Sequence, residues 1–171
     1  AEDGYDVLAL EKGRIGEPLA CSGHVSTDIW QFTGPGAREE LFQNEIYGAR
    51  FHVGGPRSDA YPFYKQEVAS NVIDRVGLDR HLAELAREAG ADVREDHTVT
   101  EVTEHHDRVA VVANGPDGVV EFEAKLVAGC DGPRSRVRDE LGLPQPDEFL
   151  HGVLAFSEED DHQDFVDVHL T

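Results

Sequence analysis

The spacing of apolar residues predicts one amphipathic helix in the middle of the chain. Within the segment GLDRHLAELAREAG they recur at helical intervals, at Leu78, Leu82, Leu85 and Ala89. Gly90 follows the last of them, and glycine commonly ends a helix because it adopts positive φ without strain. We therefore expect a helix over residues 77–90 with one apolar face.

Shorter apolar runs before this helix predict strands. Residues 6–10 predict a short buried strand that ends at the acid Glu11. Residues 46–53 alternate in polarity, which predicts a half-buried strand in a sheet with one wet side. The run VASNVIDR predicts a further short strand close to the helix.

The second half of the chain is richer in β-type runs. Between residues 91 and 125, short runs with alternating polarity predict a β-meander. Residues 126–128 predict a small buried strand that passes through a glycine turn into a helix over 135–141. Strand-like runs follow at 152–156 and 165–170. Together these elements predict the α/β fold class, in the form of an α+β mixture.

The composition indicates a folded, acidic protein. The chain of 171 residues has 35 acidic and 15 basic side chains, a formal charge of −20, and 39% hydrophobic residues. This hydrophobic share argues against a disordered acidic tail. Three lysines among so many carboxylates argue against contact with a phosphate backbone, so we expect no nucleic acid partner. No apolar run approaches the roughly 18 residues of a membrane span, which predicts a soluble, cytoplasmic protein.

The charge balance also predicts behaviour in salt. Twelve Arg stand against three Lys, and the carboxylates are scattered over every segment, a balance typical of halophilic proteins. Because salt screens repulsion among carboxylates, we expect stability to rise with KCl or NaCl, although an ordinary acidic mesophilic protein is the alternative. Cys21 and Cys130 cannot form a disulfide framework, and no spacing predicts a metal site. The lack of any Met indicates a start codon upstream of this sequence.

Two turns carry candidate nucleotide-binding chemistry. Glu11 ends the first predicted strand, where nucleotide-binding βαβ units place an acid that accepts from ribose hydroxyls. Asp131 follows residues 126–128, and Gly132 lets a backbone approach a ligand just before the next predicted helix. Either acid alone is a weak signal, because a solvated strand end looks the same. About 120 residues apart, with a helix and a meander between them, the two match the layout of glutathione-reductase-type flavoproteins.

Four segments resemble the geranylgeranyl reductase family of FAD-dependent enzymes, namely DVLALEKG, CSGHVS, VIDRVGLDRHLAELAREAGADV and VAGCDGPRSRVRDELGL. The resemblance covers nearly all of residues 4–143, and the acidic composition resembles that of haloarchaeal proteins. It implies an incomplete FAD-binding Rossmann-like core over residues 1–45 and 66–145, with the first βα unit missing. Residues 46–65 and 146–171 would form an incomplete, interleaved antiparallel sheet on the substrate side.

The same resemblance implies cofactor-binding residues at Glu11, Cys21, Ser22, Arg75, Val99, Asp131 and Gly132. On the adenosine side, Glu11 would bind the ribose, Arg75 would reach the dinucleotide, and the backbone of Val99 would line the adenine. A surface ion pair is the alternative for Arg75, and an ordinary core position is the alternative for Val99.

On the flavin side, the resemblance implies that the loop with Cys21 and Ser22 lies against the isoalloxazine ring. Asp131 and Gly132 would lie beside the flavin ribose. The resemblance also implies that His24 lies near this ring. Family members often carry Gly at this position, so a solvated loop histidine is an equal alternative for His24. A small buried apolar residue is the alternative for Cys21. No catalytic acid or base is identified.

The family reaction is the hydrogenation of C=C bonds in geranylgeranyl chains, which saturates archaeal ether lipids. The resemblance therefore implies an FAD-dependent oxidoreductase with a prenyl-lipid substrate. It also implies a cytoplasmic protein whose contact with a membrane is peripheral and apolar. The electron donor is left open between ferredoxin, NAD(P)H and a deazaflavin.

Two other functions remain open from the sequence. An FAD-dependent aromatic monooxygenase or halogenase would use the same cofactor fold, and a noncatalytic fragment would carry out no reaction. The family's GxGxxG turn, its aromatic substrate-cavity motif and its later Gly-Asp segment do not occur in this sequence. We therefore expect the chain by itself to be an inactive fragment with a weakened hold on FAD.

Overall fold

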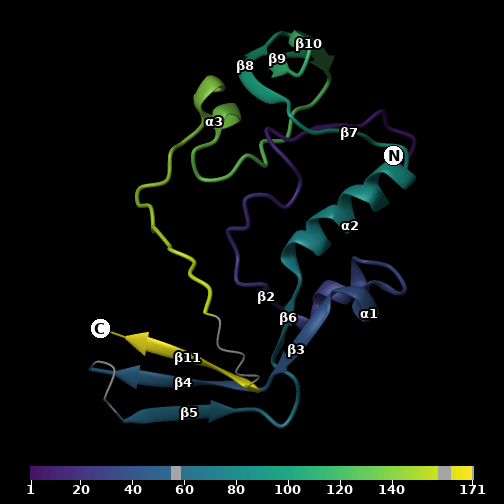
Figure 1. The fold of residues 1–171 in the computed structure, drawn as a ribbon. Coiled ribbons are helices and arrows are strands. Elements are labelled where there is room, and N and C mark those ends of the chain that lie inside the picture. Colours follow the sequence, from purple (N-terminus) through teal and green to yellow (C-terminus); the bar gives the residue numbers. More distant parts are fainter. Residues whose placement is uncertain (55–58, 158–162, 171) are drawn as a thin grey trace. The chain divides into compact units, whose positions relative to one another are not determined.

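The computed structural model of this chain describes residues 1–54, 59–157 and 163–170. The chain divides into two compact units. The first unit consists of Ala1–Glu17 and Ala83–Val153, and the second consists of Pro18–Leu82 and Leu154–Thr171. Each unit combines helix with small sheets (Figure 1), which confirms the predicted α+β mixture.

A parallel pair of short strands lies in the first unit. β1 (Leu8–Leu10) pairs with β7 (Asp92–Arg94), with Leu8 opposite Asp92. The strand predicted over residues 6–10 is therefore confirmed in a shorter form, but the prediction that it is buried is wrong, because Leu8 and Ala9 are exposed. Because the two strands run the same way, the loops that follow them leave from the same edge of the pair.

An antiparallel meander forms the larger sheet of the first unit. β8 (Thr98–Glu104), β9 (Val109–Gly115) and β10 (Gly118–Ala124) pair in the order β10-β9-β8 (Figure 1). The predicted meander is thus confirmed. Its buried apolar side chains are Val102, Val111 and Ala113. Gly118 closes the turn between β9 and β10 with a φ of 122°, which only glycine adopts readily.

Two predicted strands in this part of the chain are wrong. Residues 126–128 and 152–156 have no regular secondary structure, and no strand of the described residues pairs with them. Leu126 is 84% exposed and Val153 is 97% exposed, so these apolar runs are not buried. An apolar run becomes a strand only where a neighbouring strand satisfies its backbone groups. The helix predicted over 135–141 is confirmed as α3 (Arg136–Glu140).

The helix predicted over residues 77–90 is confirmed as α2 (Arg75–Glu88). Its first turn is capped by Asp74, whose Oδ1 accepts the N–H of Gly77 at 3.0 Å. Gly90 follows the helix with a φ of 88°. The helix enters the core of the second unit through Leu78, which is 1% exposed. That core consists of Ala37, Leu41, Ile73 and Leu78.

Small elements surround this core. The short helices η1 (Thr27–Gln31) and α1 (Ala37–Leu41) were not predicted, because each is only five residues long. β2 (His24–Val25), β6 (Ser70–Ile73) and β3 (Phe42–Ile46) form an antiparallel sheet in the order β2-β6-β3. The strand predicted from VASNVIDR is confirmed as β6.

A second sheet of this unit has the order β11-β4-β5 (Figure 1). β4 (Gly48–Val53) pairs antiparallel with β5 (Ala60–Tyr64) and parallel with β11 (Phe165–Leu170). The strand predicted over residues 165–170 is therefore confirmed.

The single strand predicted over residues 46–53 divides in two. Ile46 ends β3, whereas Gly48 begins β4 in the other sheet. Between them, the N–H of Tyr47 donates to the carbonyl oxygen of Asp164 at 2.7 Å. The alternating pattern is continuous through this point, so only the distant partner reveals the break.

The register gives the β11-β4-β5 sheet two different faces. One face, which we call the apolar face, carries Ala49, Phe51, Val53, Tyr61, Phe63, Val166, Val168 and Leu170. The opposite face, which we call the polar face, carries every charged and imidazole side chain of the three strands, at Arg50, His52, Asp167 and His169. Much of the apolar face is exposed, and Phe63 is 60% exposed.

Candidate cofactor site

Main-chain hydrogen bonds join the loops after β1 and β7. The N–H of Glu11 donates to the carbonyl oxygen of Arg94 at 2.8 Å, and the N–H of His97 donates to that of Glu11 at 2.8 Å. The N–H of Asp96 donates to the carbonyl oxygen of Gly13 at 3.2 Å. Asp96 has a φ of 55°, which is uncommon for a residue with a side chain. The strand pair therefore continues into two joined loops that carry acidic side chains.

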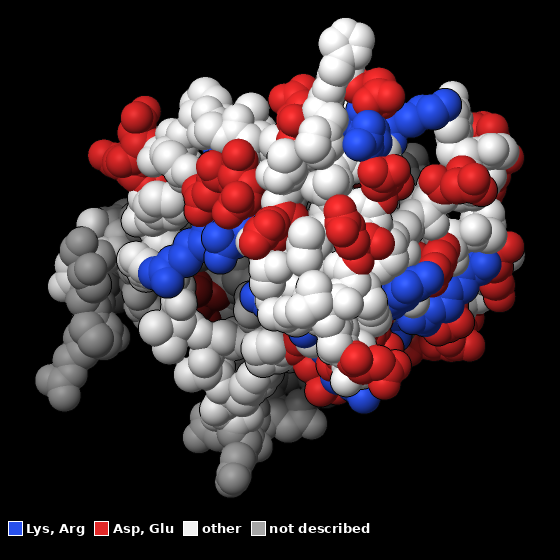
Figure 2. Space-filling view, turned by 90° about the horizontal axis from the view of Figure 1, so that it is seen from above, with Lys and Arg blue, Asp and Glu red and all other residues white. Residues whose placement is uncertain are grey.

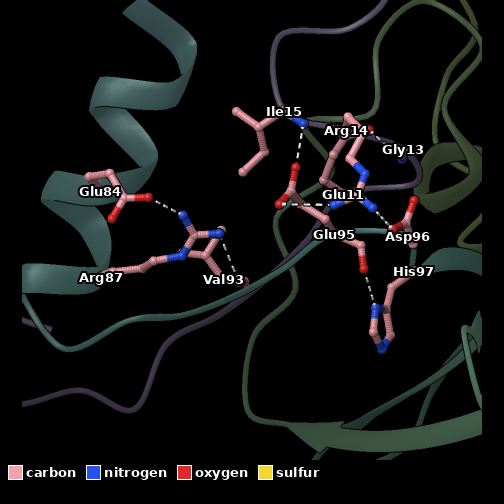
Figure 3. A network of polar contacts seen from close by, with 10 residues as sticks. All are labelled: Glu11, Gly13, Arg14, Ile15, Glu84, Arg87, Val93, Glu95, Asp96 and His97. Atoms are coloured by element: carbon pink, nitrogen blue, oxygen red, sulfur yellow. Dashed lines mark hydrogen bonds and ion pairs between the residues drawn. The ribbon is translucent and has the colours of Figure 1, made fainter. Parts of the chain in front are cut away.

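The carboxylate of Glu11 lies within this pair of loops (Figure 3). Glu11 is half-buried, and its Oε1 accepts the N–H of Gly13 at 3.0 Å. Among the described residues, its Oε2 has no hydrogen-bond partner. An ionised carboxylate can accept from two adjacent hydroxyls, so one anchored oxygen and one open oxygen suit the ribose contact predicted for Glu11.

Three side chains that the sequence analysis missed brace the same loop (Figure 3). The N–H of Ile15 donates to Oε1 of Glu95 at 2.8 Å. The guanidinium of Arg14 lies 3.9 Å from a carboxylate oxygen of Glu95 and 3.4 Å from one of Asp96. Ile15 and Glu95 are 80 positions apart, so no local window shows their contact. The feature of the sequence that could have indicated these contacts is the acidic pair Glu95 and Asp96 directly after the short strand β7.

Asp131 lies in the same unit as Glu11, but its carboxylate caps a helix. Its Oδ2 accepts the N–H of Arg136 at 2.6 Å and the N–H of Val137 at 3.2 Å, at the start of α3. Burial raises the pKa of Asp131, but hydrogen bonds from the Ser135 hydroxyl and from these amides outweigh it and lower the pKa below its usual value. Asp131 is therefore ionised at neutral pH, with one oxygen committed to the helix N-terminus.

The surroundings of Asp131 differ from the prediction. It follows an irregular segment, because residues 126–128 form no strand. Gly132 has a φ of 81°, and a Cβ there would meet open space. Glycine is thus required at this position for its backbone conformation. The contact of Asp131 and Gly132 with a flavin ribose stays a prediction.

In the second unit, Cys21 is half-buried and Ser22 is exposed on the loop before β2. Gly23 has a φ of 79°, and a Cβ there would lie 2.3 Å from the carbonyl oxygen of Ile73. The glycine of the CSG sequence therefore serves the packing of this loop against β6. The flavin contact of Cys21 and Ser22 stays a prediction.

Arg75 begins α2, and one nitrogen of its guanidinium is buried without a partner among the described residues. Its Nη2 lies 2.5 Å from Oδ1 of Asp79, one helical turn along. Its Nε is buried and has no hydrogen-bond partner among the described residues. A buried cationic donor without a partner is costly, and an anionic ligand such as a phosphate would satisfy it.

Val99 gives no distinct signal. It lies in β8 opposite Ala113 and is half-buried, as an ordinary core valine would be. The adenine contact predicted for Val99 stays a prediction. The residues present therefore fit a dinucleotide cofactor best at Glu11 and Arg75, where an open acceptor and an unpaired donor remain.

A second polar cluster, on the polar face of the β11-β4-β5 sheet, was not predicted. Asp167 accepts from Nε and Nη2 of Arg50 at 2.8 and 2.6 Å, and from Nε2 of His52 at 2.8 Å. The hydrogen bonds from Arg50 and then from His52 lower the pKa of Asp167 from 3.8 to about 2. His169 stacks on His52 with ring centroids 4.3 Å apart. The cluster holds β11 against β4.

The surface carries the charge seen in the composition. Figure 2 shows the Asp and Glu side chains spread in small groups over the visible face, with Lys and Arg side chains among them. Among the described residues, several Arg side chains form ion pairs, as Arg108 does with Glu123. Within the described ranges, no helix is both long enough and apolar enough to pass through a bilayer. The predicted dependence of stability on salt stays a prediction.

Comparison with known families matches residues 39–166 to the family described as FAD binding domain. The matched span includes α2, the β8-β9-β10 meander and the turn at Asp131. It therefore covers strands β3 to β10 and the helix that carries Arg75.

Two curated relatives have different activities in their names. Digeranylgeranylglycerophospholipid reductase 2 of Methanothermobacter thermautotrophicus is 34% identical over 142 residues, which are 82% of this chain and 36% of the relative. A 12-dehydrotetracycline 5-monooxygenase/anhydrotetracycline 6-monooxygenase of Streptomyces rimosus is 31% identical over 159 residues, which are 89% of this chain and 31% of the relative. The chain thus spans about a third of the length of these relatives.

Among solved structures, a geranylgeranyl bacteriochlorophyll reductase-like protein from Thermoplasma acidophilum superposes with a TM-score of 0.70. The alignment covers 97% of this chain and 50% of that protein, at 23% sequence identity. At this identity the likeness shows a shared fold.

Proposed function

The chain belongs to the family of FAD binding domains, and on that basis we propose that it is part of an FAD-dependent reductase of geranylgeranyl C=C bonds in archaeal ether lipid biosynthesis. The 34% identity to a digeranylgeranylglycerophospholipid reductase supports this substrate class. The observation that carries the cofactor assignment is the carboxylate of Glu11, which the N–H of Gly13 holds at one oxygen and which is open at the other.

In this proposal the chain's own residues bind and orient the cofactor. Glu11 accepts from the adenosine ribose, and the buried Nε of Arg75 donates to a phosphate oxygen. The backbone of Val99 lines the adenine. FAD held by these residues would supply, in its reduced form, the hydride for one alkene carbon, and a separate group would have to supply the proton for the other. Glu11 and Arg75 lie in different units of the chain, so each contact is proposed separately.

The flavin end of the cofactor would meet two loops. We assign Cys21 and Ser22 to the isoalloxazine side, and Asp131 with Gly132 to the flavin ribose. Since Asp131 already caps α3 through Oδ2, its second oxygen is the one available to a hydroxyl.

We assign residues 46–65 and 146–171 to the substrate side, and residues 1–45 and 66–145 to the cofactor side. The apolar face of the β11-β4-β5 sheet supports the first assignment, because a prenyl chain needs an apolar wall. Residues 55–58, 158–162 and 171 of these ranges lie outside the described residues.

The proposed partners follow from this chemistry. The proposed substrate is a prenyl lipid, and with it we propose a cytoplasmic protein whose contact with a membrane is peripheral. The electron donor is ferredoxin, NAD(P)H or a deazaflavin, and no described residue favours one of them.

An aromatic monooxygenase is the second candidate. The 31% identity to the Streptomyces rimosus monooxygenase over 89% of this chain favours it. Both candidates use FAD, so the cofactor contacts of this chain do not distinguish them. The two differ in their need for oxygen.

The test is turnover by the protein that carries this chain, with FAD and dithionite in the absence of oxygen. We expect digeranylgeranylglycerophospholipid to gain hydrogen at its C=C bonds, measured by mass spectrometry. The Glu11→Ala variant, with less bound FAD, should reduce the lipid more slowly at limiting FAD and recover at excess FAD. Oxygen-dependent hydroxylation of an aromatic substrate, with no reduction of the lipid, would assign the protein to the second candidate.

A further inference from the structure

Glu95 holds the loop that carries Glu11, although it belongs to none of the cofactor contacts proposed above. Its Oε1 accepts the N–H of Ile15 at 2.8 Å. Its side chain is 28% exposed, so this bond to an ionised group is partly shielded from water. The contact is the last in a series that joins the two loops, after the main-chain bonds of Glu11 and Gly13.

The connection from Glu95 to the Glu11 carboxylate is short. Ile15 is two residues beyond Gly13, whose N–H holds Oε1 of Glu11. Releasing the N–H of Ile15 loosens the loop on one side of Gly13, whose carbonyl oxygen is still held by the N–H of Asp96 at 3.2 Å. The direction of the Gly13 N–H is then fixed less firmly. A half-buried carboxylate that is held less firmly by the N–H of Gly13 samples more rotamers, which costs affinity when a ligand selects one of them.

We propose that Glu95 is a positioning residue, which fixes the Glu11 carboxylate for an adenosine ribose by holding the N–H of Ile15. The ribose part of this inference rests on the proposed function. The positioning part rests only on the contacts between the two loops.

Arg14 has a supporting part in this arrangement. Its guanidinium lies 3.9 Å from Glu95 and 3.4 Å from Asp96, and its side chain is 66% exposed. Exposed ion pairs at such distances contribute little. The hydrogen bond to Ile15 is therefore the contact that matters, and a neutral acceptor at position 95 should preserve it.

The first experiment measures amide hydrogen exchange by NMR on this chain. In Glu95→Ala, we expect the amides of Ile15 and Gly13 to exchange about tenfold faster, as expected for the loss of one hydrogen bond to a charged group. Glu95→Gln keeps an acceptor oxygen and should exchange at nearly the wild-type rate. Glu121→Ala removes an exposed acid of β10 and controls for the lost charge.

Two results would overturn the positioning part. One is an unchanged Gly13 amide in Glu95→Ala, and the other is a Glu95→Gln variant as fast as Glu95→Ala. Should Glu95→Ala fail to fold, amide exchange is compared between Glu95→Gln and Glu95→Ser. The serine side chain is shorter but still polar, so the amides of Ile15 and Gly13 should exchange faster in Glu95→Ser than in Glu95→Gln. Thermal melting identifies such a failure.

The second experiment tests the ribose part with the two halves of FAD. In the protein that carries this chain, we expect Glu95→Ala to bind AMP about tenfold more weakly and FMN as tightly as the wild type, by titration calorimetry, and Glu95→Gln to bind AMP as the wild type does. Equal weakening of both would overturn this part, because it indicates general damage. If the wild type binds neither AMP nor FAD, the proposed cofactor role of Glu11 fails, while amide exchange still decides whether Glu95 positions it.

Discussion

The described residues contain two parallel strand pairs, and these place their polar chemistry differently. In β1-β7 the strands are three residues long, and the acidic side chains follow them in the joined loops at one edge. In β4-β11 the strands are six residues long, and Arg50, His52 and Asp167 lie along one face of the strands. In the first pair the polar side chains lie in the loops after the strands, whereas in the second they lie along a face of the strands.

This difference indicates how each pair can serve function. A side chain in a loop beyond the end of a strand is not needed for pairing the strands, so it can keep an oxygen open to a ligand, as Glu11 does. A face presents a surface instead, so β4-β11 can combine a polar cluster that fixes the strands with an apolar side left for contact. If this distinction holds, substitutions in the two pairs should damage different properties.

The largest effect is expected for Gly48→Ala at the start of β4. A Cβ at Gly48 would lie 2.1 Å from the carbonyl oxygen of Phe63, and backbone cannot yield there without breaking the β4-β5 pairing. We expect the free energy of unfolding to fall by about 3 kcal/mol, measured by urea titration.

The matched control is Gly13→Ala in the loop after β1. A Cβ at Gly13 meets nothing within 4 Å, and the residue keeps the N–H that holds Glu11. Its unfolding free energy should change by no more than about 0.5 kcal/mol. Similar losses of unfolding free energy in Gly48→Ala and Gly13→Ala would contradict the distinction drawn between the β4-β11 and β1-β7 pairs.

A smaller loss of stability, dependent on pH, is expected for Asp167→Asn. The hydrogen bonds from Arg50 and His52 lower the pKa of Asp167 from 3.8 to about 2. Its folded-state pKa is thus below the unfolded one, so its contribution is present above pH 3.8 and is lost as the pH falls toward about 2.

The wild type should therefore lose stability over this acid range, and Asp167→Asn should lose less because it has no carboxylate to protonate. Melting temperatures from neutral pH down to about pH 2 provide the measurement. Parallel curves for the two proteins would mean that the Asp167 carboxylate does not hold β11 in solution.

An effect on binding without a comparable effect on stability is expected for Glu11→Ala. The printed side-chain hydrogen bond of Glu11 is local, from the N–H of Gly13 two residues along, and its other oxygen has no hydrogen-bond partner within the described residues, so we expect the fold to lose little when the side chain is removed. FAD affinity should fall about tenfold in the protein that carries this chain, by fluorescence titration. Asp131→Ala provides the contrast, because it removes the acceptor of the first two N–H groups of α3, beside the N-cap Ser135, and should lower stability as well. Unchanged affinity in Glu11→Ala would leave the β1-β7 loops without their proposed ligand.

The sequence predicted the elements whose evidence is local. The stripe that contains Leu78 marks α2, and the alternating runs mark the meander, because amphipathic periodicity needs only neighbouring residues. The α+β class, the family and the FAD cofactor were also predicted and are confirmed. Residues 126–128 and 152–156 show the opposite case, because apolar residues alone do not provide a pairing partner.

The candidate site shows the same limit. Glu11 was predicted, because a strand ending in an acid is visible within a few residues. Glu95 was missed, since its partner Ile15 is 80 positions away. Asp131 was recognised as a special position, but its capping of α3 depends on a turn geometry that the sequence does not specify.

The smallest effect should separate the two faces of the β11-β4-β5 sheet. Phe63 lies on the apolar face and is 60% exposed, so Phe63→Ser should cost no more than about 0.5 kcal/mol of unfolding free energy. Phe165 lies on the polar face, where the Arg50 guanidinium is 3.6 Å from its ring centroid, so Phe165→Ser should cost more. Binding of an apolar dye should fall in Phe63→Ser and not in Phe165→Ser. Equal costs would mean that the apolar face is already covered in solution, and a face that is covered cannot receive a prenyl chain.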